Sequence, residues 1–141
     1  MTAASAGVAE RVRLLGPVPL DRLMSTYRDY DVFILPTQPG EGIPRVLLEA
    51  MANGLPVITT GVSGISSLIT DESNGLVVAE SSADAIARAV VRLSHDGDLR
   101  RRLIQGGYAT ARRFTLEKQA AEMMATVEGE LRIPLAVKGA A

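Results

Sequence analysis

The chain alternates short apolar runs with longer stretches in which apolar residues recur at helical spacing. Four short runs predict strands at residues 12–15, 32–35, 56–60 and 76–78. Amphipathic stretches predict helices near residues 20–29, 43–53, 65–70, 82–95, 98–106, 107–113 and 115–128. Because strands that alternate with helices form βα units, this order predicts an α/β fold, with a parallel sheet of about four strands and flanking helices.

The length of the chain and the end of its periodic pattern define the expected domain. The 141 residues fit a single domain, since domains commonly contain about 100–200 residues. Gly129, Pro134 and Gly139 interrupt the period near the end of the chain. We therefore expect one domain over residues 1–128 and a frayed tail over residues 129–141.

Composition and charge argue against several classes of function. Hydrophobic residues make up 47% of the chain, enough for a core, and 15 Lys and Arg against 16 Asp and Glu give a net charge of −1. This balance argues against binding nucleic acids or membrane surfaces through bulk positive charge. The chain has no Cys and a single His, His95. That composition argues against disulfide frameworks and against metal sites built from thiolates or several histidines.

Signals for entering or crossing a membrane are also missing from the sequence. No run approaches the roughly 18 apolar residues of a transmembrane helix. The first ten residues have no basic segment followed by an apolar one, as a secretory signal would. We expect a cytoplasmic location, with the periphery of a membrane as a further option for a complete enzyme.

The loop at residues 36–42 is the first candidate for a binding site. It contains two prolines and two glycines among polar residues, follows a predicted strand and precedes a predicted helix. Gly42 has no Cβ and lets a ligand approach the backbone closely. Ile43, Arg45 and Val46 can offer backbone N–H groups at the helix N-terminus, which favours an anion such as a diphosphate.

Two carboxylates flank this loop and helix. Glu41 lies in the loop, and Glu49 lies about 9 Å further along the helix at 1.5 Å per residue. A carboxylate at each end could accept hydrogen bonds from the sugar and the ribose of a nucleotide sugar whose diphosphate lies between them. Spacing alone leaves open a purely structural interpretation. In it, Glu41 stabilises the helix by its favourable interaction with the helix dipole, and Glu49 is an exposed residue or an ion-pair partner.

A wider pattern surrounds the two glutamates, which have seven residues between them. The accompanying positions are Gly42, Pro44, Leu48, Ala50, Met51, Ala52, Gly54, Pro56, Val57, Ile58 and Thr60. Together they resemble the Glu-x7-Glu signature of the retaining "group 1" glycosyltransferases, which have the two-lobed GT-B architecture. Residues 31–36 and 74–78 are similar to neighbouring segments of that family, and the resemblance extends over residues 11–128.

The resemblance implies a fold and a set of site residues. The fold would be Rossmann-like, as a partial GT-B carboxyl-terminal domain that binds the nucleotide sugar. Glu49 would bind the ribose, and Glu41, as the catalytic residue, would contact the hydroxyls of the donor sugar. Backbone amides would face the sugar and diphosphate, and a loop would lie against the base. The amides belong to Gly42, Ile43, Arg45 and Val46, and the loop is Gly16-Pro17-Val18.

The resemblance also implies an activity and its partners. A sugar would pass from a nucleoside-diphosphate donor, linked to UDP, to a glycan or lipid-linked acceptor with retention at the anomeric carbon. No metal or other cofactor is expected. Nothing before Glu41 matches the Arg-x4-Lys pair with which the family grips the diphosphate, and the acceptor-binding amino-terminal lobe is missing. We therefore expect no efficient transfer by this chain alone.

Two other functions stay open on the sequence. One is a non-catalytic module that binds a nucleotide sugar or a partner chain, and the other is a sugar-nucleotide epimerase of the GT-B kind. A sheet of about four strands could also leave an edge open, through which the chain would self-associate.

Overall fold

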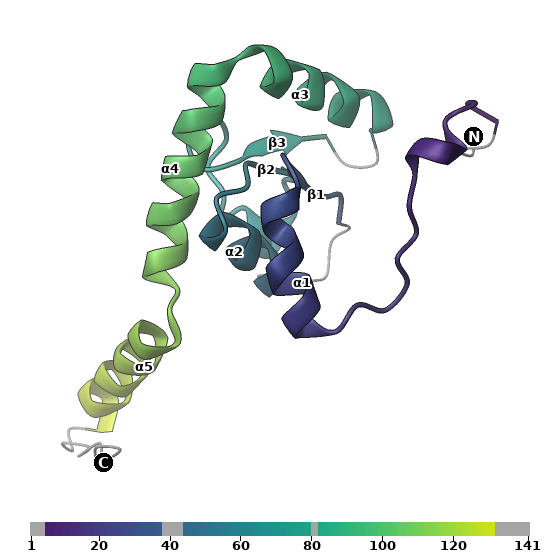
Figure 1. The fold of residues 1–141 in the computed structure, drawn as a ribbon. Helices are drawn as coiled ribbons and strands as arrows, with labels where there is room; N and C mark the ends of the chain where they lie inside the picture. The colour runs from purple at the N-terminus through teal and green to yellow at the C-terminus, as the bar shows by residue number, and fades with distance from the viewer. Residues whose placement is uncertain (1–4, 38–43, 80–81, 132–141) are drawn as a thin grey trace.

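The computed structural model describes residues 5–37, 44–79 and 82–131. Three parallel strands form its sheet in the order β1-β2-β3, with helices on both faces (Figure 1). The strands are β1 (Phe33–Leu35), β2 (Val57–Thr60) and β3 (Leu76–Val78). The helices are η1 (Ala9–Arg11), α1 (Leu20–Thr26), η2 (Tyr27–Asp29), α2 (Arg45–Ala52), η3 (Ser63–Ile65), α3 (Ala83–His95), α4 (Gly97–Arg113) and α5 (Leu116–Leu131), of which the three labelled η are single 3-10 turns. This arrangement confirms the predicted parallel α/β fold.

The central strand β2 is buried along its whole length and separates two hydrophobic clusters. Val57 belongs to the cluster under α2, and Ile58 belongs to the cluster under α3 and α4, because successive side chains of a strand point to opposite faces. The Thr59 and Thr60 hydroxyls donate to the carbonyl oxygens of Leu35 and Thr37 at 2.9 and 2.6 Å. Both buried hydroxyls of the strand therefore have hydrogen-bond acceptors.

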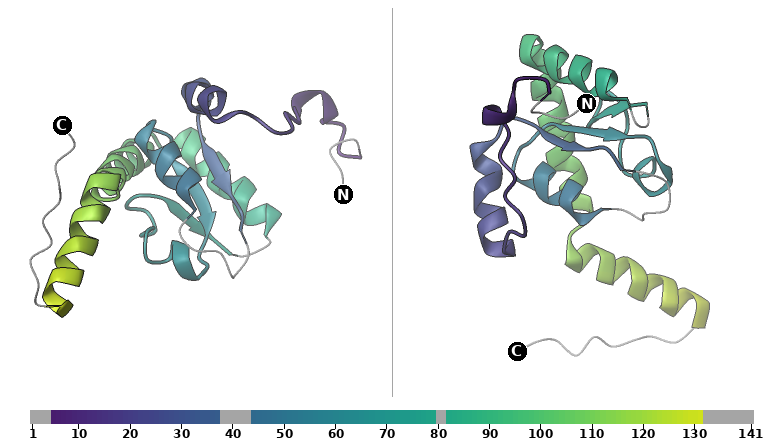
Figure 2. Two further views of the ribbon diagram at one scale, coloured as in Figure 1. Left: turned by 90° about the horizontal axis from the view of Figure 1, so that it is seen from below. Right: turned by 90° about the vertical axis from the view of Figure 1, so that its right-hand side faces the viewer.

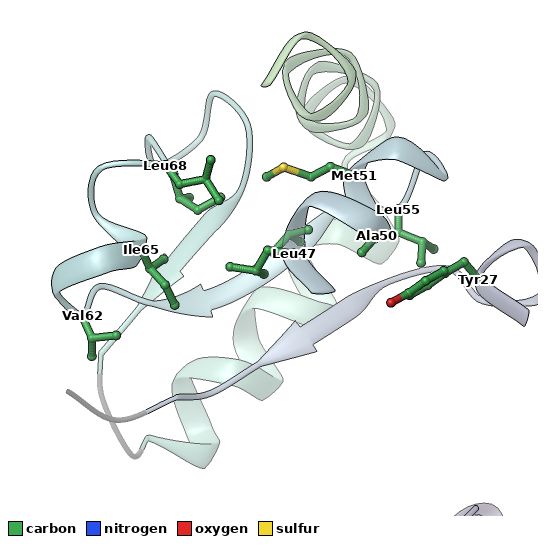
Figure 3. Packing of buried hydrophobic residues seen from close by; sticks show 10 residues of the cluster. Tyr27, Leu47, Ala50, Met51, Leu55, Val62, Ile65 and Leu68 are labelled. Atoms are coloured by element: carbon green, nitrogen blue, oxygen red, sulfur yellow. The ribbon is translucent and has the colours of Figure 1, made fainter. Parts of the chain in front are cut away.

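The larger cluster packs α2 against the sheet and against the segment that follows β2 (Figure 3). Its buried members are Tyr27, Leu47, Ala50, Met51, Leu55, Val57, Val62, Ile65, Leu68 and Ile69. The smaller cluster consists of Ile58, Leu76, Ala89, Leu93, Leu99 and Leu103. Two views of the chain show α2 and α3 on opposite faces of the sheet (Figures 1 and 2). The larger cluster thus holds α2 against the sheet.

Local side-chain caps define where the long helices α3 and α4 begin. The Ser82 hydroxyl accepts from the amide of Ala85 at 3.2 Å, and the Asp96 carboxylate accepts from the amide of Leu99 at 2.8 Å. Such acceptors satisfy amides that have no partner in the first helical turn. Asp96 lies between the two helices, which confirms the predicted break there.

The predicted strand at residues 12–15 is wrong. This segment is part of an extended arm that leads away from the sheet towards the N-terminus (Figures 1 and 2). Leu14 is 94% exposed and Leu15 is 59% exposed. An apolar run becomes a strand only where a neighbouring strand and an apolar layer receive it, and the arm lies beside neither.

The two helices predicted at residues 98–106 and 107–113 form the single helix α4. Gly106 and Gly107 lie at the boundary between the two predicted helices, and glycine lowers helix stability. A Cβ at Gly106 would overlap the carbonyl oxygen of Ser73, and one at Gly107 would lie 3.3 Å from the Met51 side chain. The glycines let α4 approach its neighbours closely. Near residues 65–70, the helical structure is limited to η3 at Ser63–Ile65.

The last helix, α5, projects from the rest of the molecule (Figures 1 and 2). Two of its apolar side chains face solvent, since Leu116 is 79% exposed and Met123 is 64% exposed. The helix runs through Gly129 to Leu131, three residues beyond its predicted end. Across the described ranges, every helix is too short or too polar to cross a membrane.

Candidate functional site

The candidate site is built around α2, which follows the loop after β1. Pro44 precedes the helix with φ −70° and ψ 118°, and its carbonyl accepts from the amide of Leu47 at 3.1 Å. The amides of Arg45 and Val46 lie in the first turn, where a helix supplies no acceptor of its own. That turn carries no acidic side chain. The positive end of the helix dipole is therefore not neutralised from within α2.

The other end of α2 is closed by a glycine turn that the sequence predicted. Gly54 adopts φ +80°, a conformation that side chains rarely take. Its amide donates to the carbonyl of Met51, and the amide of Leu55 donates to the carbonyl of Ala50, both at 3.1 Å. This pair of bonds is a Schellman motif. With Leu55 and Met51 buried, it fixes the helix that carries Glu49.

Glu49 is half-buried on α2 and has a partner that the sequence did not indicate. The hydroxyl of Tyr27, in η2, donates to Oε2 of Glu49 at 3.2 Å. In the sequence, Tyr27 belongs to the apolar face of the amphipathic stretch at residues 20–29. A signal was nevertheless present, because a tyrosine on a buried face needs a hydrogen-bond partner for its hydroxyl.

The environment of Tyr27 keeps its hydroxyl protonated. The residue is 3% exposed, and its ring meets that of Phe33 edge-on, with centroids 6.1 Å apart. Burial, together with the negative charge of Glu49 and the hydrogen bond to it, raises the pKa of Tyr27 to about 12. The phenol therefore donates to Glu49 throughout the physiological pH range.

A cavity of about 420 Å³ opens beside Glu49. It is lined by Met24, Arg45, Leu48, Glu49, Ala52, Ala111, Phe114, Leu116 and Gln119. Its size falls in the range of small-molecule sites, which combine apolar walls with a few polar groups. Here a carboxylate and a guanidinium from successive turns of α2 are combined with walls from α1, α4 and α5. Such a cavity can offer an acceptor for hydroxyl groups and a cation for an anion.

The remaining predicted site residues lie elsewhere. Glu41, Gly42 and Ile43 lie outside the described residues. Gly16 and Pro17 are exposed on the arm before α1, where Gly16 has φ +62°, and Val18 is half-buried. None of these three arm residues lines the cavity beside Glu49. In the described part of the chain, Glu49, Arg45 and Val46 are thus the predicted residues that the structure brings together on α2.

In residues 5–37, 44–79 and 82–131, no group of three or more acidic or histidine side chains could hold a metal ion. The chemistry available at α2 is therefore that of a carboxylate, a guanidinium, a phenol and backbone amides.

A curated relative matches almost the whole chain. The D-inositol 3-phosphate glycosyltransferase of Acidothermus cellulolyticus is 37% identical over 131 residues, which are 93% of this chain and 27% of that enzyme. The chain spans 22–33% of the length of the curated relatives it matches. It thus corresponds to one portion of each relative.

Solved structures of other proteins are similar to this chain in fold. The carboxyl-terminal domain of a glycosyl transferase group 1 family protein from Francisella tularensis is 28% identical with a TM-score of 0.70, and the match covers 79% of this chain and 57% of that one. The pneumococcal O-GlcNAc transferase GtfA, solved in complex with UDP and GlcNAc, is 25% identical with a TM-score of 0.73. That match covers 93% of this chain and 26% of GtfA. The fold is therefore the Rossmann-like fold of a GT-B carboxyl-terminal domain.

The family assignment rests on a match over most of the chain. The sequence model of the glycosyl transferases group 1 family matches residues 2–110. That segment contains all three strands and the helix that carries Glu49. The chain belongs to the glycosyl transferases group 1 family.

Proposed function

We propose that this chain is part of the donor-binding lobe of a retaining glycosyltransferase. Its donor would be a nucleoside-diphosphate sugar in which the nucleotide is UDP. Its acceptor would be a hydroxyl group of a glycan or of a lipid-linked compound. Membership of the family supports the reaction class. The complex of GtfA with UDP and GlcNAc supports UDP as the nucleotide. The Acidothermus relative is named for D-inositol 3-phosphate, a compound with hydroxyl groups, and this name supports a hydroxyl group as the acceptor.

One observation carries the proposal for the donor site. Half-buried Glu49 lines a cavity with Arg45, one helical turn from the first-turn amides of α2. A carboxylate there would accept hydrogen bonds from the two ribose hydroxyls, and such bonds to a charged group are strong. The amides of Arg45 and Val46 would face the diphosphate. The ribose and the diphosphate would then lie side by side along α2.

The other predicted residues complete the proposed site. Glu41 would be the catalytic residue that contacts hydroxyls of the transferred sugar, with the amides of Gly42 and Ile43 beside it. The base would lie against the loop at residues 16–18. In the reaction, the bond between the anomeric carbon and the diphosphate oxygen breaks and a bond to the acceptor hydroxyl oxygen forms. The hydroxyl proton passes to the leaving diphosphate, on which negative charge grows in the transition state. Amides and a helix dipole aimed at that charge would lower the barrier by electrostatic stabilisation.

Transfer would require an amino-terminal lobe that binds the acceptor and supplies cations for the diphosphate. The chain spans 27% of the Acidothermus relative, which supports a need for further polypeptide. We expect transfer only when that lobe is added, either as a separate chain or by fusion. A glycosidic product from the mixture would support the transferase, whereas an epimerised nucleotide sugar would point to an epimerase of the same architecture.

Calorimetric titration of the chain with UDP tests the proposed site. We expect weak binding, with a dissociation constant on the order of 0.1–1 mM, because the site would be incomplete. Glu49→Ala should weaken binding by roughly 1–3 kcal/mol, the scale of a lost hydrogen bond to a charged group. Glu130→Ala, at an exposed glutamate of α5, is the matched control. A folded wild-type chain that does not bind UDP would contradict the proposal.

A second arm of the titration tests the amide of Arg45. Arg45→Pro removes the N–H group at a position where proline suits a helix, and the extended ψ of Pro44 accepts a following proline. Arg45→Ala removes the side chain and keeps the amide. If the amide faces the diphosphate, Arg45→Pro should bind UDP several-fold more weakly than Arg45→Ala, by about 1 kcal/mol. Equal affinities would exclude a role for this amide.

A further inference from the structure

The contact between Tyr27 and Glu49 joins two segments that are far apart in the chain. Tyr27 lies in η2, before β1, and Glu49 lies in α2, after β1. The hydroxyl of Tyr27 donates to Oε2 of Glu49 at 3.2 Å across 22 positions of sequence. A glutamate has three side-chain torsions, and a single fixed donor restricts all of them. The contact therefore decides how the Glu49 carboxylate is oriented.

The donor itself is held rigidly. The Tyr27 ring is a buried member of the cluster that also contains Ala50 of α2 and Leu55, which follows that helix (Figure 3). Its edge-on contact with Phe33 adds a specific orientation, since aromatic pairs favour this geometry. A ring enclosed in this way cannot follow a moving carboxylate. Tyr27 thus gives the Glu49 carboxylate a hydrogen-bond donor in a fixed position.

The hydrogen bond uses part of the accepting capacity of the carboxylate. An ionised carboxylate offers about four lone-pair directions on two oxygens, and Tyr27 occupies one direction on Oε2. Glu49 also lines the cavity, together with residues of α4 and α5. The raised pKa of Tyr27, about 12, leaves the phenol as a donor at working pH. It has no role as an acid or base there.

We propose that Tyr27 is a positioning residue for the donor site, whose hydroxyl holds the Glu49 carboxylate in the orientation that receives the two ribose hydroxyls. This inference rests on the ribose-binding role proposed for Glu49. If the role of Tyr27 were structural alone, loss of its hydroxyl would lower the stability of the fold and leave the preference between nucleotides unchanged. A positioning role predicts that loss of the Tyr27 hydroxyl lowers the binding preference for ribose over deoxyribose, because a misplaced carboxylate would accept less well from the ribose hydroxyls.

The test compares UDP with 2′-deoxy-UDP by calorimetric titration of the whole chain. The wild-type chain should bind UDP about fivefold or more tightly than 2′-deoxy-UDP, the scale of one hydrogen bond to a carboxylate. Tyr27→Phe keeps the ring and its packing, and should reduce this preference about three- to fivefold. Tyr30→Phe, the same change at a tyrosine that is 55% exposed, should keep the wild-type preference.

A double variant separates positioning from structure. If Tyr27 acts through Glu49, then Tyr27→Phe added to Glu49→Gln should cause no further loss of preference. Additive losses, or a Tyr27→Phe chain with the wild-type preference, would overturn the proposal and leave the donor site intact. Absence of UDP binding by the folded wild-type chain would overturn both the proposed function and this inference.

A measurement on the wild-type chain covers the case of a Tyr27→Phe variant that does not fold. Carbon-13 labelling of tyrosine reports the ring carbon that bears the hydroxyl. The Tyr27 signal should shift on adding UDP and should shift less with 2′-deoxy-UDP at equal saturation. Equal shifts with the two nucleotides would overturn the positioning role.

Discussion

Asn74 shows how a single buried polar residue holds three segments of the chain together. Its side-chain amide donates to the carbonyl of Leu68 at 2.9 Å and to the hydroxyl of Thr110 at 2.7 Å. Its oxygen accepts from the amide of Thr70 at 2.7 Å. The residue is 7% exposed, so water cannot easily replace these partners. Buried groups that lose their partners are costly, because the desolvation penalty remains.

We expect Asn74→Ala to lower the free energy of unfolding by about 1–3 kcal/mol, since it leaves buried partners unsatisfied. Asn53→Ala is the matched comparison. Asn53 is half-buried and donates to the carbonyl of Glu49 at 2.9 Å, and water can take its place, so its loss should be smaller. Urea denaturation followed by circular dichroism measures both. Equal losses would contradict a special role for burial at Asn74.

At the scale of elements, α4 owes its position to residues with low helix propensity. Gly106 faces the turn at Ser73 and Asn74, where an added Cβ would overlap the Ser73 carbonyl and lie 3.0 Å from Cα of Asn74. Gly129, in the projecting helix α5, would meet nothing within 4 Å. The same residue type is therefore a packing requirement in one helix and an intrinsic weakness in the other.

We expect opposite effects from alanine at these two glycines. Gly106→Ala should destabilise the chain by about 1–3 kcal/mol, because the overlap forces the turn or the helix to move. Gly129→Ala should stabilise α5 by up to about 1 kcal/mol through helix propensity. Thermal denaturation of the two variants beside the wild-type chain measures the difference. A Gly106→Ala variant as stable as wild type would show that α4 does not depend on this close approach.

For the whole molecule, the described residues leave apolar surface uncovered at three places. The arm at residues 5–18 leads away from the body, α5 projects from it, and β1 pairs with a strand on one side only. Ile34, in the middle of β1, is 37% exposed. An edge strand with apolar side chains and free backbone groups invites pairing with another chain.

We expect the chain to self-associate through the open edge of β1 in a concentration-dependent way. Ile34→Lys should weaken the association about tenfold or more, because a charge on an edge strand opposes pairing. Val91→Lys, at an aliphatic residue of α3 that is 56% exposed, should leave the association unchanged. Sedimentation velocity over a concentration series measures both. Equal effects of the two lysines would show that the association does not use β1.

The sequence predicted those parts of the site that lie in one continuous segment. The helix after β1, its glycine turn at Gly54 and the place of Glu49 on it follow from local spacing and turn chemistry. Tyr27 belongs to the apolar face of the amphipathic pattern at residues 20–29, but its hydrogen bond to Glu49 was not predicted. No local pattern specifies which of the residues on that face will meet a side chain 22 positions later.

The order of the three strands of the sheet, the parallel α/β class and the family signature around Glu49 could all be predicted from the sequence alone. These features depend on hydrophobic period, turn residues and a contiguous motif, all of which are local. The tertiary structure decided that residues 12–15 stay outside the sheet, that α4 continues through two glycines and that Tyr27 holds Glu49. Each of these depends on which distant surface lies opposite a residue, and only the packed chain brings those surfaces together.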